Sequence, residues 1–97
     1  MIRHLVIMKF AADCAPEQHD RMLNMLAGLE REVPGVRAMT VGVHALSDSP
    51  LADIGLVVDL DDREALAAYT THPYHLSVGQ YFGPIKESAS IVDLELP

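Results

Sequence analysis

Residues 53–75 read DIGLVVDLDDREALAAYTTHPYH, and this stretch decides the fold because it joins a strand, a helix and a sharp corner. Its first part, at about 53–60, is a short run of branched apolar residues, which is typical of a buried strand. Asp61, three residues before a glutamate, has the spacing of a capping box and predicts the start of a helix that runs through Tyr69. That helix ends at His72, because the residue before a proline avoids the helical region.

The residues before this stretch predict a strand, a helix and a second strand. Residues 2–10 (IRHLVIMKF) are β-branched-rich and apolar on both faces, as expected of a strand that is covered on two sides. Pro16 suits the first position of a helix, and Pro34-Gly35 ends it. The apolar stripe of this helix, spaced by three and four, comprises Met22, Met25, Leu26, Leu29 and Val33. Residues 36–44 form the next strand, and a polar loop at 47–50 follows.

The residues after the stretch complete the pattern. A helix runs from about Pro73, is interrupted near Gly83-Pro84, and leads to a last strand at 88–96. The order β-α-β-β-α-α-β predicts an α+β, ferredoxin-like fold over a single domain, residues 1–97, with an antiparallel sheet and helices on one face. The other apolar face then needs a second sheet, and a homodimer supplies it as a dimeric α+β barrel.

Composition limits the partners of the chain. The net charge of −7 and the pI near 4.9 disfavour binding to nucleic acid or to an anionic membrane surface. No apolar run approaches the about 20 residues of a membrane span. The lone Cys14 indicates a reducing compartment, so we expect a cytoplasmic protein. With 49% hydrophobic residues and a mean hydropathy of +0.16, so small a domain is expected to self-associate.

The corner at residues 69–75 carries the candidate functional side chains. Pro73 makes His72 the N-cap of the following helix and places His75 in its first turn. The helix dipole disfavours a charged imidazole there, so a neutral His75 could accept a proton from a carbon beside a carbonyl. Tyr69 could donate a hydrogen bond to the developing enolate, and His4 could point into the same pocket.

A structural reading of these residues stays open beside the chemical one. Histidine and tyrosine side chains also satisfy the backbone ends of a helix–proline–helix corner. His72 and His75 straddle a helix junction and lack an evident third ligand, so we expect no metal and no cofactor. His19, on the polar side of the first helix, is expected to be solvated.

Three segments together resemble the stress-responsive A/B barrel (Dabb) family. They are residues 2–10, the turn at 33–36, and the stretch 53–75, whose tyrosine followed by His-Pro-x-His is the family's signature; the closing residues 91–93 also fit. The resemblance covers essentially the whole chain. It implies a homodimeric α+β barrel with a cavity between sheet and helices.

The resemblance implies little about the reaction. Most bacterial members have no assigned chemistry, and some plant members look like structural stress proteins. One plant branch consists of cofactor-independent polyketide cyclases that close a ring by aldol condensation, and its acting residues correspond to Tyr69 and His75. This chain departs from that branch at Ile54, where the branch has a histidine, and at the bulky Tyr74, which we expect to narrow the pocket.

Three hypotheses about function follow. The first is a homodimer of undefined reaction that binds a small apolar or aromatic molecule between sheet and helices, with His4, His72 and Tyr74 as ligand-binding residues. The second is a cyclase-like enzyme with His75 as base and Tyr69 as hydrogen-bond donor. The third is a structural stress-response protein without a ligand. Small quinol-type monooxygenases of the same barrel class fit less well, because they lack the His-Pro-x-His corner.

Overall fold

The computed structural model of the chain describes residues 1–46 and 52–97, and the loop predicted at 47–50 lies outside the described residues. The elements run in the predicted order, with a short 3-10 helix added before the last strand. They are β1 (Ile2–Phe10), α1 (Pro16–Glu32), β2 (Val36–Val43), β3 (Ile54–Leu60), α2 (Arg63–Thr71), α3 (Pro73–Phe82), η1 (Gly83–Ile85) and β4 (Lys86–Glu95). Each predicted strand or helix is present, with ends that differ by one or two residues.

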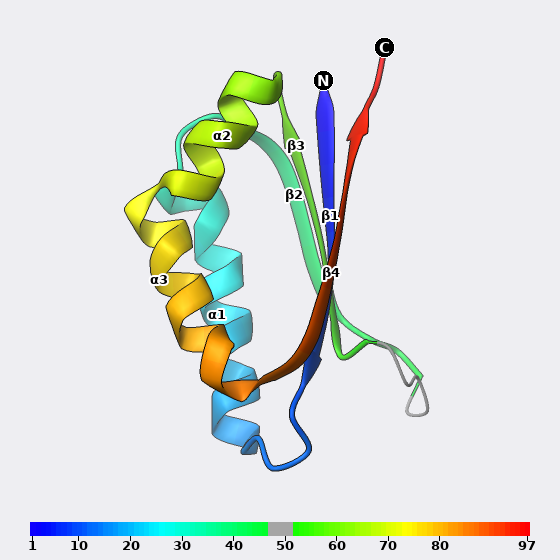
Figure 1. The fold of residues 1–97 in the computed structure, drawn as a ribbon, viewed down its shortest axis with the longest axis vertical. Coiled ribbons are helices and arrows are strands. Elements are labelled where there is room, and N and C mark those ends of the chain that lie inside the picture. Colours follow the sequence, from blue (N-terminus) through cyan, green and yellow to red (C-terminus); the bar gives the residue numbers. More distant parts are fainter. Residues whose placement is uncertain (47–51) are drawn as a thin grey trace.

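The four strands form one antiparallel sheet in the order β2-β3-β1-β4, so β1 is paired on both sides and β4 lies at an edge. All three helices cover the same face of this sheet (Figure 1). The predicted ferredoxin-like α+β architecture is therefore confirmed. Within the described residues, no helix is long and apolar enough to cross a membrane.

Helix α1 begins and ends where local signals place it. Pro16 occupies its first turn, and the Gln18 side chain accepts a hydrogen bond from the backbone N–H of Ala15 at 2.8 Å. After the helix, Gly35 has a φ of +92°, a conformation that favours glycine and turns the chain into β2. The helix buries one stripe against the sheet, as predicted, although Met25 is only half-buried.

The corner between α2 and α3 is set by two capping side chains. Asp62 caps α2, because its carboxylate accepts from the N–H of Ala65 at 2.8 Å. The prediction of Asp61 was wrong by one residue, since the cap must lie three residues before the amide it bonds. His72 caps α3 as predicted, its Nδ1 accepting from the N–H of Tyr74 at 3.1 Å.

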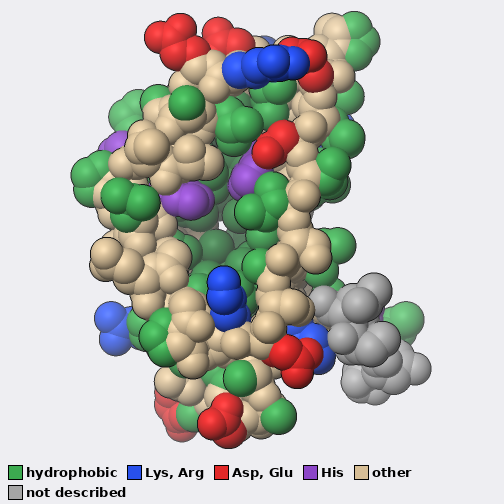
Figure 2. Space-filling view, viewed as in Figure 1, with side chains coloured by type: hydrophobic (Ala, Val, Ile, Leu, Met, Phe, Trp, Pro, Cys, Tyr) green, Lys and Arg blue, Asp and Glu red, His purple; other side chains and the backbone are tan. Residues whose placement is uncertain are grey.

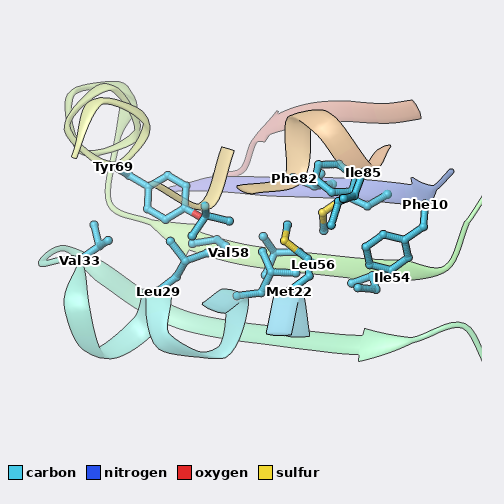
Figure 3. Close-up of a cluster of buried hydrophobic side chains, with 14 of the residues drawn as sticks. Phe10, Met22, Leu29, Val33, Ile54, Leu56, Val58, Tyr69, Phe82 and Ile85 are labelled. Carbon is cyan, nitrogen blue, oxygen red and sulfur yellow. The ribbon is translucent and has the colours of Figure 1, made fainter. Parts of the chain in front are cut away.

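The core lies between the sheet and the helices. Along β1, every second residue from Ile2 to Phe10 is buried, and His4 is the polar member of that row, at 4% exposed. Val58, Leu60 and Tyr69 are 0% exposed. Figure 3 shows the ring of Tyr69 projecting into the same cluster as Val58 and Leu29. A residue from a helix corner thus forms part of the core.

The opposite face of the sheet has no helix over it. Ile7 on β1 is 45% exposed, and Val92 and Leu94 on β4 are 51% and 41% exposed. The register places Leu5 opposite Val92, so these apolar side chains share one surface. We call this surface, formed by Leu5, Ile7, Val57, Val92 and Leu94, the outer face. The prediction that both faces of the first strand are apolar is confirmed.

The expectation that His19 is solvated was wrong. Its ring stacks on the ring of Phe10, with centroids 4.0 Å apart and planes inclined by 14°. The side chain is half-buried. The helical pattern assigned His19 to the polar side of α1, whereas the end of β1 supplies an aromatic surface that the pattern alone does not reveal.

Candidate functional site

A cavity of about 190 Å³ lies between the sheet and the helices. Figure 2 shows the hollow between the two layers, with histidine side chains in purple on its walls. The cavity draws its lining from both layers: His4, Val6, Met8, Met22, Leu26, Leu29, Leu56, Tyr69, Thr70, His75, Val78, Gly79, Phe82, Ala89 and Ile91. The structure thus brings together three of the predicted site residues, namely Tyr69, His75 and His4.

Tyr69 sits at the polar end of the cavity with an unsatisfied hydroxyl. The side chain comes from the last turn of α2 and is fully buried, and among the described residues its hydroxyl has no hydrogen-bond partner. Burial raises the pKa of Tyr69 to about 12. The hydroxyl therefore keeps its proton at neutral pH and acts as a hydrogen-bond donor.

His75 lies beside Tyr69, with ring centroids 4.8 Å apart. Its Nδ1 atom is also buried and unpartnered among the described residues. Burial is the main cause that lowers the pKa of His75, and the Thr70 backbone acts in the opposite direction. This direction favours the neutral imidazole, and its main cause is burial, whereas the sequence suggested the helix dipole.

His4 is held by a residue that the sequence did not identify. Its Nδ1 lies 2.5 Å from a carboxylate oxygen of Asp93, which faces it across the β1–β4 pair. The carboxylate accepts, so Nδ1 carries a proton. The ring of His4 meets the ring of Tyr69 edge-on, with centroids 5.6 Å apart. Three polar rings therefore line one end of the cavity in the order His4, Tyr69, His75.

The other two predicted ligand-binding residues do not line the cavity. His72 is occupied as the cap of α3. The hydroxyl of Tyr74 donates to the backbone carbonyl of Met25 on α1 at 2.7 Å. Tyr74 therefore ties α3 to α1 and does not narrow the cavity, contrary to our expectation. Gly28 leaves room for this contact, because a Cβ there would lie 2.2 Å from the Tyr74 hydroxyl.

The remainder of the cavity wall is apolar. Among the described residues that line it, none is lysine or arginine, so no cation is present to pair with a phosphate or carboxylate. In residues 1–46 and 52–97, no group of three or more His, Cys, Asp or Glu side chains has an arrangement that could hold a metal ion. The site therefore has the Tyr69 hydroxyl as a donor and the imidazoles of His4 and His75, within an otherwise mostly apolar lining.

Solved structures show where this fold occurs elsewhere. A dimeric ferredoxin-like protein of unknown function from Thermobifida fusca matches with a TM-score of 0.87 at 23% identity, over 98% of this chain and 90% of that one. A dimeric ferredoxin-like protein of unknown function from a Jannaschia species matches with a TM-score of 0.80 at 26% identity, over 98% of both chains. The hydroxynitrile lyase of Passiflora edulis matches with a TM-score of 0.85 at only 14% identity, over 99% of this chain and 93% of that one. The last likeness is one of fold alone.

Sequence comparison assigns the family. A search of curated proteins gives no match. The sequence model of the Stress Responsive A/B Barrel Domain (Dabb) matches residues 2–96, which is nearly the whole chain. The chain belongs to the stress responsive A/B barrel (Dabb) family.

Proposed function

We propose that this protein binds a small, uncharged, mostly apolar carbonyl compound in the cavity between sheet and helices. The observation that carries the proposal is the pair of buried, unpartnered polar atoms, the Tyr69 hydroxyl and His75 Nδ1, at one end of that cavity. A buried polar group without a partner costs about 1–3 kcal/mol. A ligand carbonyl that accepts from Tyr69 would supply the missing partner.

The size and polarity of the cavity define the ligand further. An apolar cavity of about 150 Å³ in another protein accommodates benzene, so about 190 Å³ here suits one ring with a short substituent. The apolar wall favours a ring or a branched chain over a sugar. The absence of lysine and arginine from the described lining disfavours nucleotides and other anions.

Acetophenone and ethylbenzene test this proposal, because they have nearly the same shape and differ in the carbonyl. Titration calorimetry is expected to show tighter binding of acetophenone, by about threefold to tenfold, the range expected for one net hydrogen bond. Tyr69→Phe should abolish that preference, whereas Tyr74→Phe, which removes a hydroxyl outside the cavity, should retain it. Equal binding of the two compounds to the wild type, or no binding of either, would contradict the proposal and favour the structural hypothesis.

A second candidate function is proton abstraction from the carbon beside the carbonyl, as in the cyclase-like hypothesis. Its support is the adjacency of a neutral imidazole and a protonated phenol, since burial lowers the pKa of His75 and raises that of Tyr69. His75 would take the proton from carbon while Tyr69 donates a hydrogen bond to the enolate oxygen. The hydroxynitrile lyase match shows an enzyme on this fold and says nothing about the reaction here.

Hydrogen–deuterium exchange measures this step directly. In D₂O, the wild type is expected to accelerate deuterium incorporation into the methyl group of acetophenone, which NMR detects. A positioned general base contributes about 10²–10⁴-fold, so His75→Gln should reduce the protein-dependent rate at least tenfold. Exchange at the buffer rate in the presence of bound acetophenone would leave a binding protein and exclude this chemistry.

We also propose that the protein is a homodimer that packs outer face against outer face. Support comes from the exposed apolar side chains there, with a groove of about 270 Å³ among them. Two apolar sheet faces that pack together form a core about 10 Å thick. The similar Thermobifida and Jannaschia proteins are described as dimeric.

A further inference from the structure

The pairing of His4 with Asp93 narrows the class of ligand. We infer that Asp93 is a positioning residue that turns His4 into a hydrogen-bond acceptor in the cavity wall, so that the ligand carries a hydroxyl group in addition to its carbonyl. This inference rests on the proposed function, because it concerns the same cavity. The ligand class that it specifies is a hydroxyaryl ketone or a compound of similar polarity.

The geometry gives Asp93 control over the tautomer of His4. His4 and Asp93 are cross-strand partners on β1 and β4, and their side chains meet at 2.5 Å through Nδ1. A neutral imidazole carries a single N–H, so the proton held at Nδ1 leaves Nε2 as an acceptor. The partner of one ring nitrogen thus decides the role of the other.

The placement of His4 directs that acceptor at a ligand. The His4 side chain is 5% exposed and lines the cavity, and within the described part of the chain no hydrogen bond to Nε2 is present. In the neutral imidazole with its proton at Nδ1, Nε2 is an acceptor open to a donor on a ligand in the cavity. Tyr69 lies next to it but its hydroxyl also lacks a partner, so the two polar atoms do not satisfy each other. A ligand hydroxyl would donate to His4 while its carbonyl accepts from Tyr69.

The pair is not required merely to hold the strands together. β1 and β4 are joined by a ladder that runs from the pair of Ile2 and Glu95 to that of Phe10 and Lys86. Asp93 is 37% exposed, so its carboxylate would remain solvated without His4. The neighbouring acid on the same strand face, Glu95, instead pairs with Arg63 on the surface. Glu95 therefore provides a matched control outside the cavity.

Matched ligand pairs test the inference. The probes are the 3′ and 4′ isomers of hydroxyacetophenone and the corresponding methylacetophenones, which replace the hydroxyl by a methyl group of similar size. The wild type is expected to bind at least one hydroxyl isomer about threefold to tenfold more tightly than its methyl counterpart. Asp93→Asn should remove or reverse this preference, and Glu95→Gln should retain it.

Nitrogen NMR of the histidine rings gives a readout that needs no ligand. The wild type is expected to show His4 protonated at Nδ1, and Asp93→Asn should shift the proton to Nε2, because the amide can donate to Nδ1. If the hydroxyacetophenones bind the wild type no more tightly than the methylacetophenones do, this inference is overturned and the carbonyl proposal stays intact. A wild-type His4 protonated only at Nε2 would also overturn it. Failure of acetophenone itself to bind would instead overturn the proposed function.

Discussion

At the scale of single residues, the Tyr69 hydroxyl is expected to lower the stability of the protein while providing a donor in the cavity. Its ring fills the core, whereas its hydroxyl is buried without a partner among the described residues. We expect Tyr69→Phe to raise the free energy of unfolding by about 1 kcal/mol, because it removes an unsatisfied group and keeps the ring. Chemical denaturation monitored by circular dichroism measures this change.

Tyr74→Phe is the matched control for that change. Its hydroxyl donates to the carbonyl of Met25 at 2.7 Å, so its removal should lower the free energy of unfolding by about 0.5–1.5 kcal/mol. Opposite signs for the two variants identify Tyr69 as a residue retained for the cavity. A loss of stability in Tyr69→Phe as large as that in Tyr74→Phe would indicate a hydrogen bond that satisfies the hydroxyl.

His75 should make stability depend on pH. Burial lowers its pKa in the folded protein below the ordinary value of about 6.5. As the pH falls below that value, the unfolded chain binds a proton that the folded protein does not, so stability is lost. Between about pH 7.5 and 5, melting temperatures of the wild type should therefore fall more than those of His75→Gln.

The exposed His44 provides the control for this titration. His44→Gln removes a histidine outside the cavity and serves as the matched variant for His75→Gln. Equal slopes for the wild type and His75→Gln would show that His75 is not desolvated in solution.

At the scale of elements, the contact between α1 and α3 depends on Gly28. A Cβ at this position would lie 2.2 Å from the hydroxyl of Tyr74 and 3.1 Å from its ring. Gly28→Ala gains about 1 kcal/mol of helix propensity but should lose more through the clash and the broken hydrogen bond. We expect a net loss of about 1–2 kcal/mol, measured by denaturant unfolding.

Two comparisons isolate the clash as the cause. In a Tyr74→Ala background, Gly28→Ala should stabilise the protein, because the side chain that it meets is gone. Gly79→Ala should also stabilise it by up to about 1 kcal/mol, since a Cβ at this helical position meets no atom within 4 Å. A stabilising Gly28→Ala in the wild type would mean that Tyr74 does not pack against α1.

At the scale of the whole molecule, the outer face determines assembly. We expect the wild type to sediment as a dimer at micromolar concentration, about twice its 10.6 kDa. Val92→Arg places a charge in the middle of the outer face and should give a folded monomer. Sedimentation equilibrium, with circular dichroism to verify folding, measures both.

A helix-face substitution controls for the added charge. Leu76 on α3 is exposed to the same extent as Val92, 51%, but lies outside the outer face. Leu76→Arg should remain a dimer. Dissociation by Leu76→Arg with retention of the dimer by Val92→Arg would place the interface on the helical side.

The sequence by itself determined the order of elements, the apolar faces and the three polar rings of the site, with Asp93 the residue that it missed. Alternation along β1 and the stripe on α1 are local patterns, and proline and glycine mark their ends within the chain. Tyr69 and His75 were also predictable together, because the helix–proline–helix corner that joins them spans only residues 69–75. The one-residue error at Asp62 reflects two adjacent aspartates, either of which can cap a helix.

Only the tertiary structure decided which distant side chains complete the site. Asp93 meets His4 because β4 pairs with β1 in one register, and the two residues are 89 positions apart. A shift of that register by one residue would turn Asp93 to the outer face, and no local pattern specifies the register. Tyr74 turns away from the cavity because α1 presents Gly28 and the backbone carbonyl of Met25 to it. Strand pairing therefore determines the contact of Asp93 with His4, and helix packing determines the orientation of Tyr74. Both depend on the whole chain.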